Sequence, residues 1–424
     1  MAKRTKTTLA MFGGEQAVQR PAPAWPVTGE LEVAWMEAVV RSGKWSWLGP
    51  HETAFCDEYR GFIGSRYCVA LANGTVTMQC ALQAVGVEPG DEVIVPGLTW
   101  CATAQAALDI GANVVFADID QETLCLDPKA AEKAITKKTK AMIPVHLYGC
   151  MCDMDAIMAI AKKHKLKVVE DVAHQHGSQW RNQGAGAIGD AGSFSFQQSK
   201  VLTCGEGGAV TTNDETVYNI VFALKQVGWG PDGKPANKYG HNYRITEMQT
   251  ALLRGGLTRI TEQTRIREEN VARIREGLAK IGGPLRAARR DPRITRQAYY
   301  AMTFVYDSKK AGGLPREAYR QALGMEGFHV NGTYWPVYAT PLLNLYDKTS
   351  PVPYRDPRRI QDYRNLKLPN VEKAVNETAL IMPHTFLLGD AEYVGELLRA
   401  MDKVNGNLPK VASWWREKQA AEGK

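Results

Sequence analysis

The chain has 424 residues, of which 44% are hydrophobic and 23% are charged. This composition is ordinary for a globular protein, and the length suffices for two domains. The net charge is a modest +7 and no run of Lys and Arg is interleaved with aromatic residues, so we expect no nucleic-acid partner.

No stretch is apolar enough to predict a membrane span, and the basic first residues lack the apolar core of a signal peptide. The eight cysteines include no Cys-x2-Cys pair. We therefore expect a cytoplasmic protein with free thiols, no membrane partner and no metal site.

The first segment, residues 1–30, contains Pro21, Pro23 and Pro26. These prolines predict a mobile arm and an extended lead-in. A short helix is expected over residues 30–42, followed by a loop with two tryptophans.

Residues 31–281 alternate between predicted helices and strands, which indicates a mainly parallel sheet covered by helices. The predicted strands span residues 67–72, 92–96, 113–118, 141–145, 166–171 and 209–212. The predicted helices span residues 52–63, 76–85, 102–110, 128–135, 153–164 and 214–226. Ligands bind at the carboxyl edge of such sheets, so polar residues directly after these strands are candidates for a functional site.

Two such positions follow the first two strands. Gly74 and Thr75 open the helix after the first strand. Free N–H groups and the positive end of the helix dipole meet there, which makes an anion site, although a threonine that only caps its helix is the simpler alternative. Trp100 follows the next strand and is a candidate for the same site. The alternative for Trp100 is that its side chain only packs in the core.

A carboxylate and a lysine follow two later strands. Asp171 ends a buried strand, and Lys200 comes shortly after the alternating run Ser193-Phe194-Ser195-Phe196, a pattern typical of a strand end. Removal from water lowers the pKa of an amine, which makes it a nucleophile able to form a Schiff base. A carboxylate in the same site suits pyridoxal 5′-phosphate (PLP), because it keeps the pyridine nitrogen protonated. The alternatives are a surface lysine in a turn and a helix-capping aspartate.

The rest of the chain predicts a second unit. Thr246 is expected to cap a long helix over residues 247–281, whose arginines and glutamates indicate a solvated, salt-bridged face. Gly282 and Gly283 end that helix and mark a domain boundary. A strand–helix–strand pattern then predicts a small α+β domain over residues 282–407, and residues 408–424 predict a frayed helical tail.

Three runs carry a more specific resemblance: Glu-Asp-Val-Ala-His at 170–174, Ser-Phe-Ser-Phe-Gln-Gln-Ser-Lys at 193–200, and Gly-Glu-Gly-Gly at 205–208. They resemble the DegT/DnrJ/EryC1/StrS family of PLP-dependent aminotransferases, over roughly residues 15–405. The Gln-Gln-Ser-Lys part is similar to the branch that aminates scyllo-inosose or 2-deoxy-scyllo-inosose. The resemblance implies an aspartate-aminotransferase-like (fold type I) α/β enzyme, with a large PLP-binding domain over residues 31–281.

The resemblance also implies roles for residues around PLP. Gly74, Thr75 and Ser195 are expected to bind the phosphate group of PLP. Trp100 is expected to stack on the face of the pyridine ring, and His174 to lie beside the 3′-oxygen. His146 and His176 are interpreted as structural histidines.

Two further residues are placed by resemblance alone. Asn242, in the run Asn-Tyr-Arg-Ile-Thr-Glu-Met-Gln, corresponds to a residue that reaches the PLP phosphate of the neighbouring subunit, which implies a homodimer. Tyr338 stands where many nucleotide-sugar members carry a histidine near the substrate. This departure favours an acceptor other than a nucleotide-linked sugar.

The implied reaction moves an amino group from L-glutamine or L-glutamate to a ketone on a polyhydroxylated ring, with Lys200 as the Schiff-base residue and general base and Asp171 as its catalytic partner. The donor carboxylate needs a cation, which the sequence does not identify. The alternatives are a nucleotide-linked keto-sugar aminotransferase, an enzyme like 3-amino-5-hydroxybenzoate synthase, and a non-catalytic regulatory protein that has kept the fold.

Overall fold

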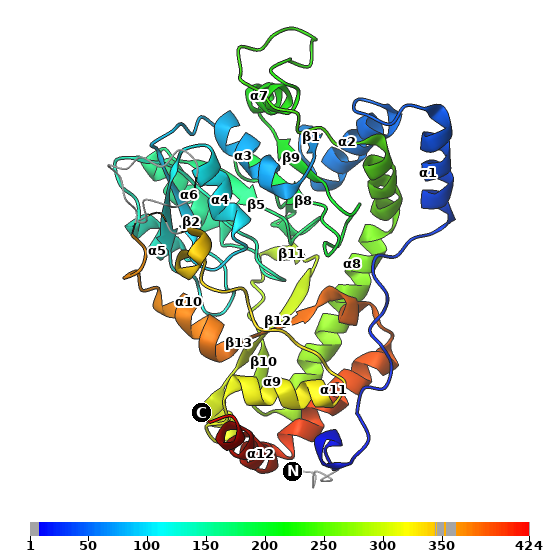
Figure 1. Cartoon of the computed structure of the whole chain (residues 1–424), viewed down its shortest axis with the longest axis vertical. Coiled ribbons are helices and arrows are strands. Elements are labelled where there is room, and N and C mark those ends of the chain that lie inside the picture. Colours follow the sequence, from blue (N-terminus) through cyan, green and yellow to red (C-terminus); the bar gives the residue numbers. More distant parts are fainter. Residues whose placement is uncertain (1–7, 344, 346–351, 353–361, 424) are drawn as a thin grey trace.

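The computed structural model describes residues 8–343, 345, 352 and 362–423 (Figure 1). Its centre is a seven-stranded sheet in the order β1-β9-β8-β5-β4-β2-β3. The strands, in that order, are Tyr67–Leu71, Gly208–Thr212, Ala191–Ser195, Lys167–Asp171, Thr139–Met142, Glu92–Pro96 and Asn113–Ala117. Only β9 runs antiparallel to its neighbours, which confirms the mainly parallel sheet.

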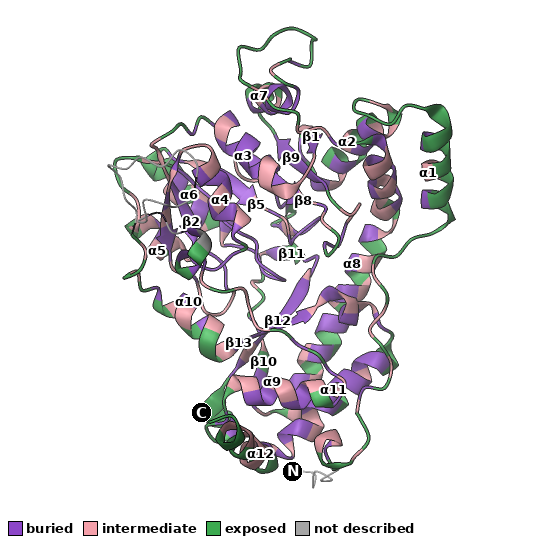
Figure 2. Cartoon of the chain, in the orientation of Figure 1, coloured by how far each residue is buried: buried purple, intermediate pink, exposed green. Residues whose placement is uncertain are grey.

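Helices cover this sheet, and its strands are buried (Figure 2). The helices of this part are α1 (Glu30–Ser42), α2 (Pro50–Ile63), α3 (Gly74–Ala84), α4 (Ala102–Asp109), α5 (Pro128–Lys133), α6 (Met154–His164) and α7 (Glu215–Lys225). Side-chain caps set several of their starts. Asn73 caps α3, Asp153 caps α6 and Asp214 caps α7, each by accepting backbone N–H bonds that the helix itself leaves unpaired.

The long helix α8 (Glu247–Ile281) links the two parts of the chain, and its predicted bounds are confirmed. Thr246 and Gln249 form a capping box at its start. Gly282, with φ of 63°, ends it in a positive-φ conformation that favours glycine.

The carboxyl-terminal part is a small α+β unit around a three-stranded antiparallel sheet in the order β10-β12-β13. Its strands and helices are β10 (Leu285–Ala287), β11 (Ile294–Arg296), β12 (Ala301–Tyr306), α9 (Arg316–Met325), α10 (Pro369–Lys373), β13 (Ala379–Pro383), α11 (Ala391–Asn405) and α12 (Leu408–Ala421). Strand β11 pairs instead with β6 (Gln179–Trp180), which forms a hairpin with β7 (Gln183–Gly184). The polar, glycine-rich run over residues 179–189 predicts such a hairpin from the sequence.

Residues 8–30 and 408–423 differ from the loose states that the sequence predicts for the two ends, and residues 1–7 of the predicted arm lie outside the described residues. In the arm, Leu9 and Val18 are buried in the core of the small unit, and Glu326 accepts bonds from two backbone N–H groups of the arm. At the other end, α12 packs on α9 with Val411 fully buried. The expected frayed tail is therefore a packed helix. The sequence does not reveal this packing because the apolar partners lie far away along the chain.

Within the described residues, no helix is both long and apolar enough to cross a membrane.

Candidate active site

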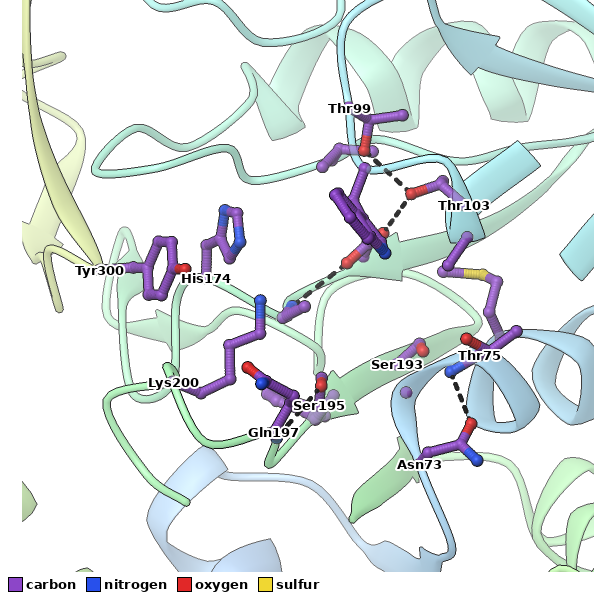
Figure 3. Close-up of a pocket in the computed structure, with 18 of the residues that line it drawn as sticks. Asn73, Thr75, Thr99, Thr103, His174, Ser193, Ser195, Gln197, Lys200 and Tyr300 are labelled. Carbon is purple, nitrogen blue, oxygen red and sulfur yellow. Dashed lines mark hydrogen bonds between the residues drawn. The ribbon is translucent and has the colours of Figure 1, made fainter. Parts of the chain in front are cut away.

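A cavity of about 710 Å³ opens at the carboxyl edge of the large sheet. It is lined by the residues that follow β2, β5 and β8, by the start of α3, and by two tyrosines from the carboxyl-terminal part. Seven residues predicted from the sequence line this cavity: Gly74, Thr75, Trp100, Asp171, His174, Ser195 and Lys200. Figure 3 shows several of them pointing toward one another from different elements.

Asp171 ends β5, and its carboxylate is held by two donors. The Thr103 hydroxyl donates to Oδ2 at 2.8 Å, and the Ala173 N–H donates to Oδ1 at 3.2 Å. Thr103 in turn lies 2.9 Å from the Thr99 hydroxyl. Burial raises the pKa of Asp171, while these two bonds and the charge of Lys200 act in the opposite direction. The result is an oriented carboxylate at the cavity wall.

Lys200 is only 9% exposed. Burial lowers the pKa of its amine from 10.5 to about 8, against the opposing charges of Asp171 and Glu206. Its Nζ lies 4.8 Å from the ring centroid of Tyr300. A buried amine with this pKa is a far better nucleophile at neutral pH than a solvated lysine.

His174 stacks on Tyr300, with ring centroids 3.9 Å apart and planes 12° apart. Its Nδ1 accepts the Tyr148 N–H at 3.1 Å, so the neutral ring carries its hydrogen on Nε2. Burial and the charge of Lys200 hold the pKa of His174 well below its usual range. Nε2 lies 3.5 Å from the Tyr334 hydroxyl, and this ring is therefore a neutral donor at the cavity.

The start of α3 abuts Ser195. A Cβ added to Gly74 would lie 2.6 Å from the Ser195 Cβ, so this position has no room for a side chain. Asn73 caps the helix by accepting from the N–H of Thr75 at 3.1 Å and of Val76 at 3.0 Å. The helix end and the hydroxyls of Thr75 and Ser195 thus gather at one end of the cavity (Figure 3), a setting that suits an anionic group.

The structure does not bring two predicted residues into this lining. Asn242 is exposed and its Oδ1 accepts from the Arg244 N–H at 3.4 Å. Tyr338 is 6% exposed and donates its hydroxyl to Glu372 at 3.4 Å. Its ring packs near Phe116, with centroids 6.0 Å apart, so Tyr338 is part of the buried core and its role toward a substrate stays a prediction.

Several other lining residues were not predicted as site residues, among them Thr103, Glu206, Tyr300 and Tyr334. Thr103 carries a weak signal, because it lies one helical turn after Thr99 in the segment that follows β2. The two tyrosines carry no local signal. They reach the cavity because the carboxyl-terminal part folds back onto the sheet edge.

Comparison with known proteins places the chain in a family. Residues 26–382 match the DegT/DnrJ/EryC1/StrS aminotransferase family. The chain belongs to this family. It is a PLP-dependent aminotransferase, as the sequence predicts.

Two relatives and one solved structure show how far the similarity of this aminotransferase extends. It is 38% identical to a putative L-glutamine:3-amino-2,3-dideoxy-scyllo-inosose aminotransferase of Streptoalloteichus tenebrarius, over 94% of this chain and 98% of the relative. It is 37% identical to the L-glutamine:2-deoxy-scyllo-inosose aminotransferase of Streptomyces fradiae, over 93% and 97%. The crystal structure of 3-amino-5-hydroxybenzoic acid synthase superposes with a TM-score of 0.79 at 29% identity, over 90% of this chain and 98% of the other. These matches confirm the predicted fold class.

The cavity of this aminotransferase fits PLP. The cofactor needs an amine for its aldehyde, a carboxylate for its ring nitrogen and an anion site for its phosphate. The cavity holds a buried amine at Lys200 and an oriented carboxylate at Asp171, and its far end is shaped by the close approach of Gly74 to Ser195.

Proposed function

We propose that this aminotransferase transfers an amino group from L-glutamine or L-glutamate to a ketone carbon of an inosose-type ring. The names of the two relatives support both the donor and the acceptor. The charge of the cavity carries the argument for the acceptor.

Among the described residues that line the cavity, the charged ones are Asp171, Lys200 and Glu206, and His174 is neutral. The described lining contains no arginine. A nucleotide-linked sugar brings a diphosphate, which proteins hold with arginines and lysines. Here Lys200 is engaged with PLP, and Glu206 would repel a diphosphate. The remaining polar lining is hydroxyl and amide groups, as on Ser199 and Gln197, which suits an uncharged polyhydroxylated ring.

Within this proposal, each site residue has a defined task. Asp171 would pair with the ring nitrogen of PLP, and the start of α3 with Ser195 would hold the phosphate. Trp100 and His174 would flank the ring. Bound PLP supplies an electron sink for the pair of electrons left on the amino-bearing carbon.

Lys200 performs the proton transfers. Lys200 would hold the aldehyde carbon of PLP until the donor binds, and at a pKa of about 8 a substantial fraction of its free amine is neutral near physiological pH. The free amine then removes the proton from the amino-bearing carbon of the donor. In the second half of the reaction it returns a proton to the carbon that was the ketone of the acceptor.

The catalytic unit that we propose is a homodimer. Exposed apolar side chains gather around α1 and the loops near it, on Val33, Val40, Trp45 and Leu48, and α1 is largely exposed (Figure 2). Such a surface favours a protein partner. Asn242 is exposed as well, and in the dimer it would reach the phosphate end of the neighbouring site.

The test is a half-reaction screen with the pyridoxamine phosphate form of the enzyme. Scyllo-inosose or 2-deoxy-scyllo-inosose should restore the absorbance of PLP bound to Lys200, and a nucleotide-linked keto-sugar should not. The opposite pattern would overturn the proposed acceptor. Lys200→Ala serves as the control, because it cannot regain the bound form.

A second candidate is an enzyme like 3-amino-5-hydroxybenzoate synthase, which the structural match favours. That candidate predicts turnover of a cyclic aminated precursor to an aromatic product without an added amino donor. Formation of an aromatic chromophore under those conditions would replace the inosose proposal.

A further inference from the structure

Arg267, in the middle of α8, is the most unusual charged residue of the described chain. The sequence places it on a solvated, salt-bridged face, and this expectation is wrong, because its side chain is 0% exposed. None of its three guanidinium nitrogens has a hydrogen-bond partner among the described residues. Burial lowers its pKa to about 9. Five N–H donors buried without an acceptor are costly, so a partner for them is expected.

His384 supplies the complementary group. It begins the turn after β13, a segment that packs on α8. Its Nε2 lies 3.1 Å from the Ser199 carbonyl oxygen. A carbonyl only accepts, so Nε2 carries the hydrogen. Its Nδ1 is then a bare acceptor, and it is buried with no partner among the described residues.

Both unpaired side chains pack against Trp25 of the arm. The guanidinium carbon of Arg267 lies 5.8 Å from the Trp25 ring centroid. The same ring packs edge-on against His384, with centroids 4.6 Å apart and planes at 88°. Burial lowers the pKa of His384 to about 3, and the charge of Arg267 acts in the same direction. Arg267 and His384 therefore share one buried compartment.

This compartment faces the turn that carries Lys200. The Trp25 Nε1–H donates to the Gln198 carbonyl at 3.2 Å, and His384 donates to the next carbonyl, that of Ser199. The Tyr300 hydroxyl lies 3.1 Å from the Ser199 hydroxyl. Both peptide carbonyls before Lys200 are thus held by side chains from outside the large sheet.

We propose that Arg267, by rotation of its side chain, donates an N–H to Nδ1 of His384 and, through His384, acts as a positioning residue that fixes the turn before Lys200 and aims its amine into the cavity. The bond pairs a donor and an acceptor that would otherwise each be buried unpaired, which is unfavourable. It fixes the His384 tautomer that the Ser199 carbonyl requires. The proposal rests on Lys200 as the PLP-bearing residue and not on the identity of the keto acceptor.

The test uses the full-length apo-protein and two readouts. The first is the rate of covalent PLP attachment, in which Nζ of Lys200 adds to the aldehyde carbon and the aldehyde oxygen leaves as water. The second is the affinity for pyridoxamine 5′-phosphate, which fills the same cavity but has no aldehyde. A positioning role affects the first readout and leaves the second unchanged, whereas a general loss of structure lowers both.

Arg267→Met and His384→Phe should each slow PLP attachment by about tenfold, the equivalent of one hydrogen bond, and should leave pyridoxamine 5′-phosphate affinity unchanged. The double variant should be no slower than either single variant, because both act through one contact. His384→Gln, which keeps an N–H for the Ser199 carbonyl, should recover part of the rate. Arg265→Met is the matched control, since Arg265 is exposed on the same helix and paired with Glu262.

Three outcomes would overturn the proposal. They are an unchanged attachment rate in either folded variant, additive losses in the double variant, and losses that follow pyridoxamine 5′-phosphate affinity. If Arg267→Met does not fold, His384→Phe tests the same contact from its other end. Failure of the wild-type protein to attach PLP would count against the proposed function itself, so the two failures are distinguishable.

Discussion

The pKa of Lys200 leads to a quantitative prediction about pH. An amine with an ordinary pKa of 10.5 is neutral in about one molecule per thousand at pH 7.5, whereas an amine with a pKa of about 8 is neutral in about one molecule in four. Only the neutral amine attacks the aldehyde of PLP. Burial therefore raises the reactive fraction by roughly two hundredfold at this pH.

The assay measures the rate of PLP attachment to the apo-protein by absorbance at a series of pH values. The rate should be slow at low pH, rise through a midpoint near pH 8, where Lys200 loses its proton, and level off above it. Free N-acetyl-lysine methyl amide is the reference, because it shares the ionisations of PLP but has a solvated amine. Glu206→Gln should move the midpoint to lower pH, because it removes a negative charge that stabilises the ammonium form. That shift should be small, because Glu206 is exposed and solvent screens its charge.

A midpoint close to that of the reference would refute the reasoning, because it would mean that Lys200 is solvated in the protein. An upward shift in Glu206→Gln would contradict the assigned signs of the nearby charges.

Three other changes should be informative. Gly74→Ala places a methyl group against Ser195, 2.6 Å from its Cβ, and should weaken pyridoxamine 5′-phosphate binding by about tenfold in a titration; unchanged binding would separate Gly74 from the cofactor. Thr103→Val removes one donor from Asp171, raises the pKa of that carboxyl further, and should slow the donor half-reaction by about tenfold in single turnovers; an unaltered rate would argue against this support. Asn242→Ala chains mixed with Lys200→Ala chains should show more activity than the two separate proteins, and no gain would count against a shared site.

Much of the fold was accessible from the sequence because its signals are local. Strands of the large sheet are short apolar runs between glycines and polar turns, and α8 begins with a threonine cap and ends at a glycine. Strand order is not a local property. The antiparallel β9 between β1 and β8 follows from how the chain returns after Lys200, and no periodicity records it.

The site divides in the same way. Asp171 and Lys200 could be predicted because both follow strands whose carboxyl ends meet at one edge of the sheet. Tyr300 and Tyr334 could not, since they enter from a part of the chain whose position depends on long-range packing. Arg267 shows the limit most clearly. Several nearby residues on its helix are charged, and Arg267 packs against Trp25, which lies far away along the chain.

Three histidines near strand ends show how partners, and not sequence position, decide a role. Both nitrogens of His146 are used inside the protein, one by Glu170 at 3.0 Å and the other by the Cys152 N–H at 3.1 Å. His176 is fully buried, and its Nδ1 lies 2.9 Å from the Tyr59 hydroxyl. In His174 one nitrogen is fixed by the backbone and the ring lines the cavity. Its donor nitrogen is thereby oriented and is not used in a hydrogen bond within the core, so this ring can donate to a ligand.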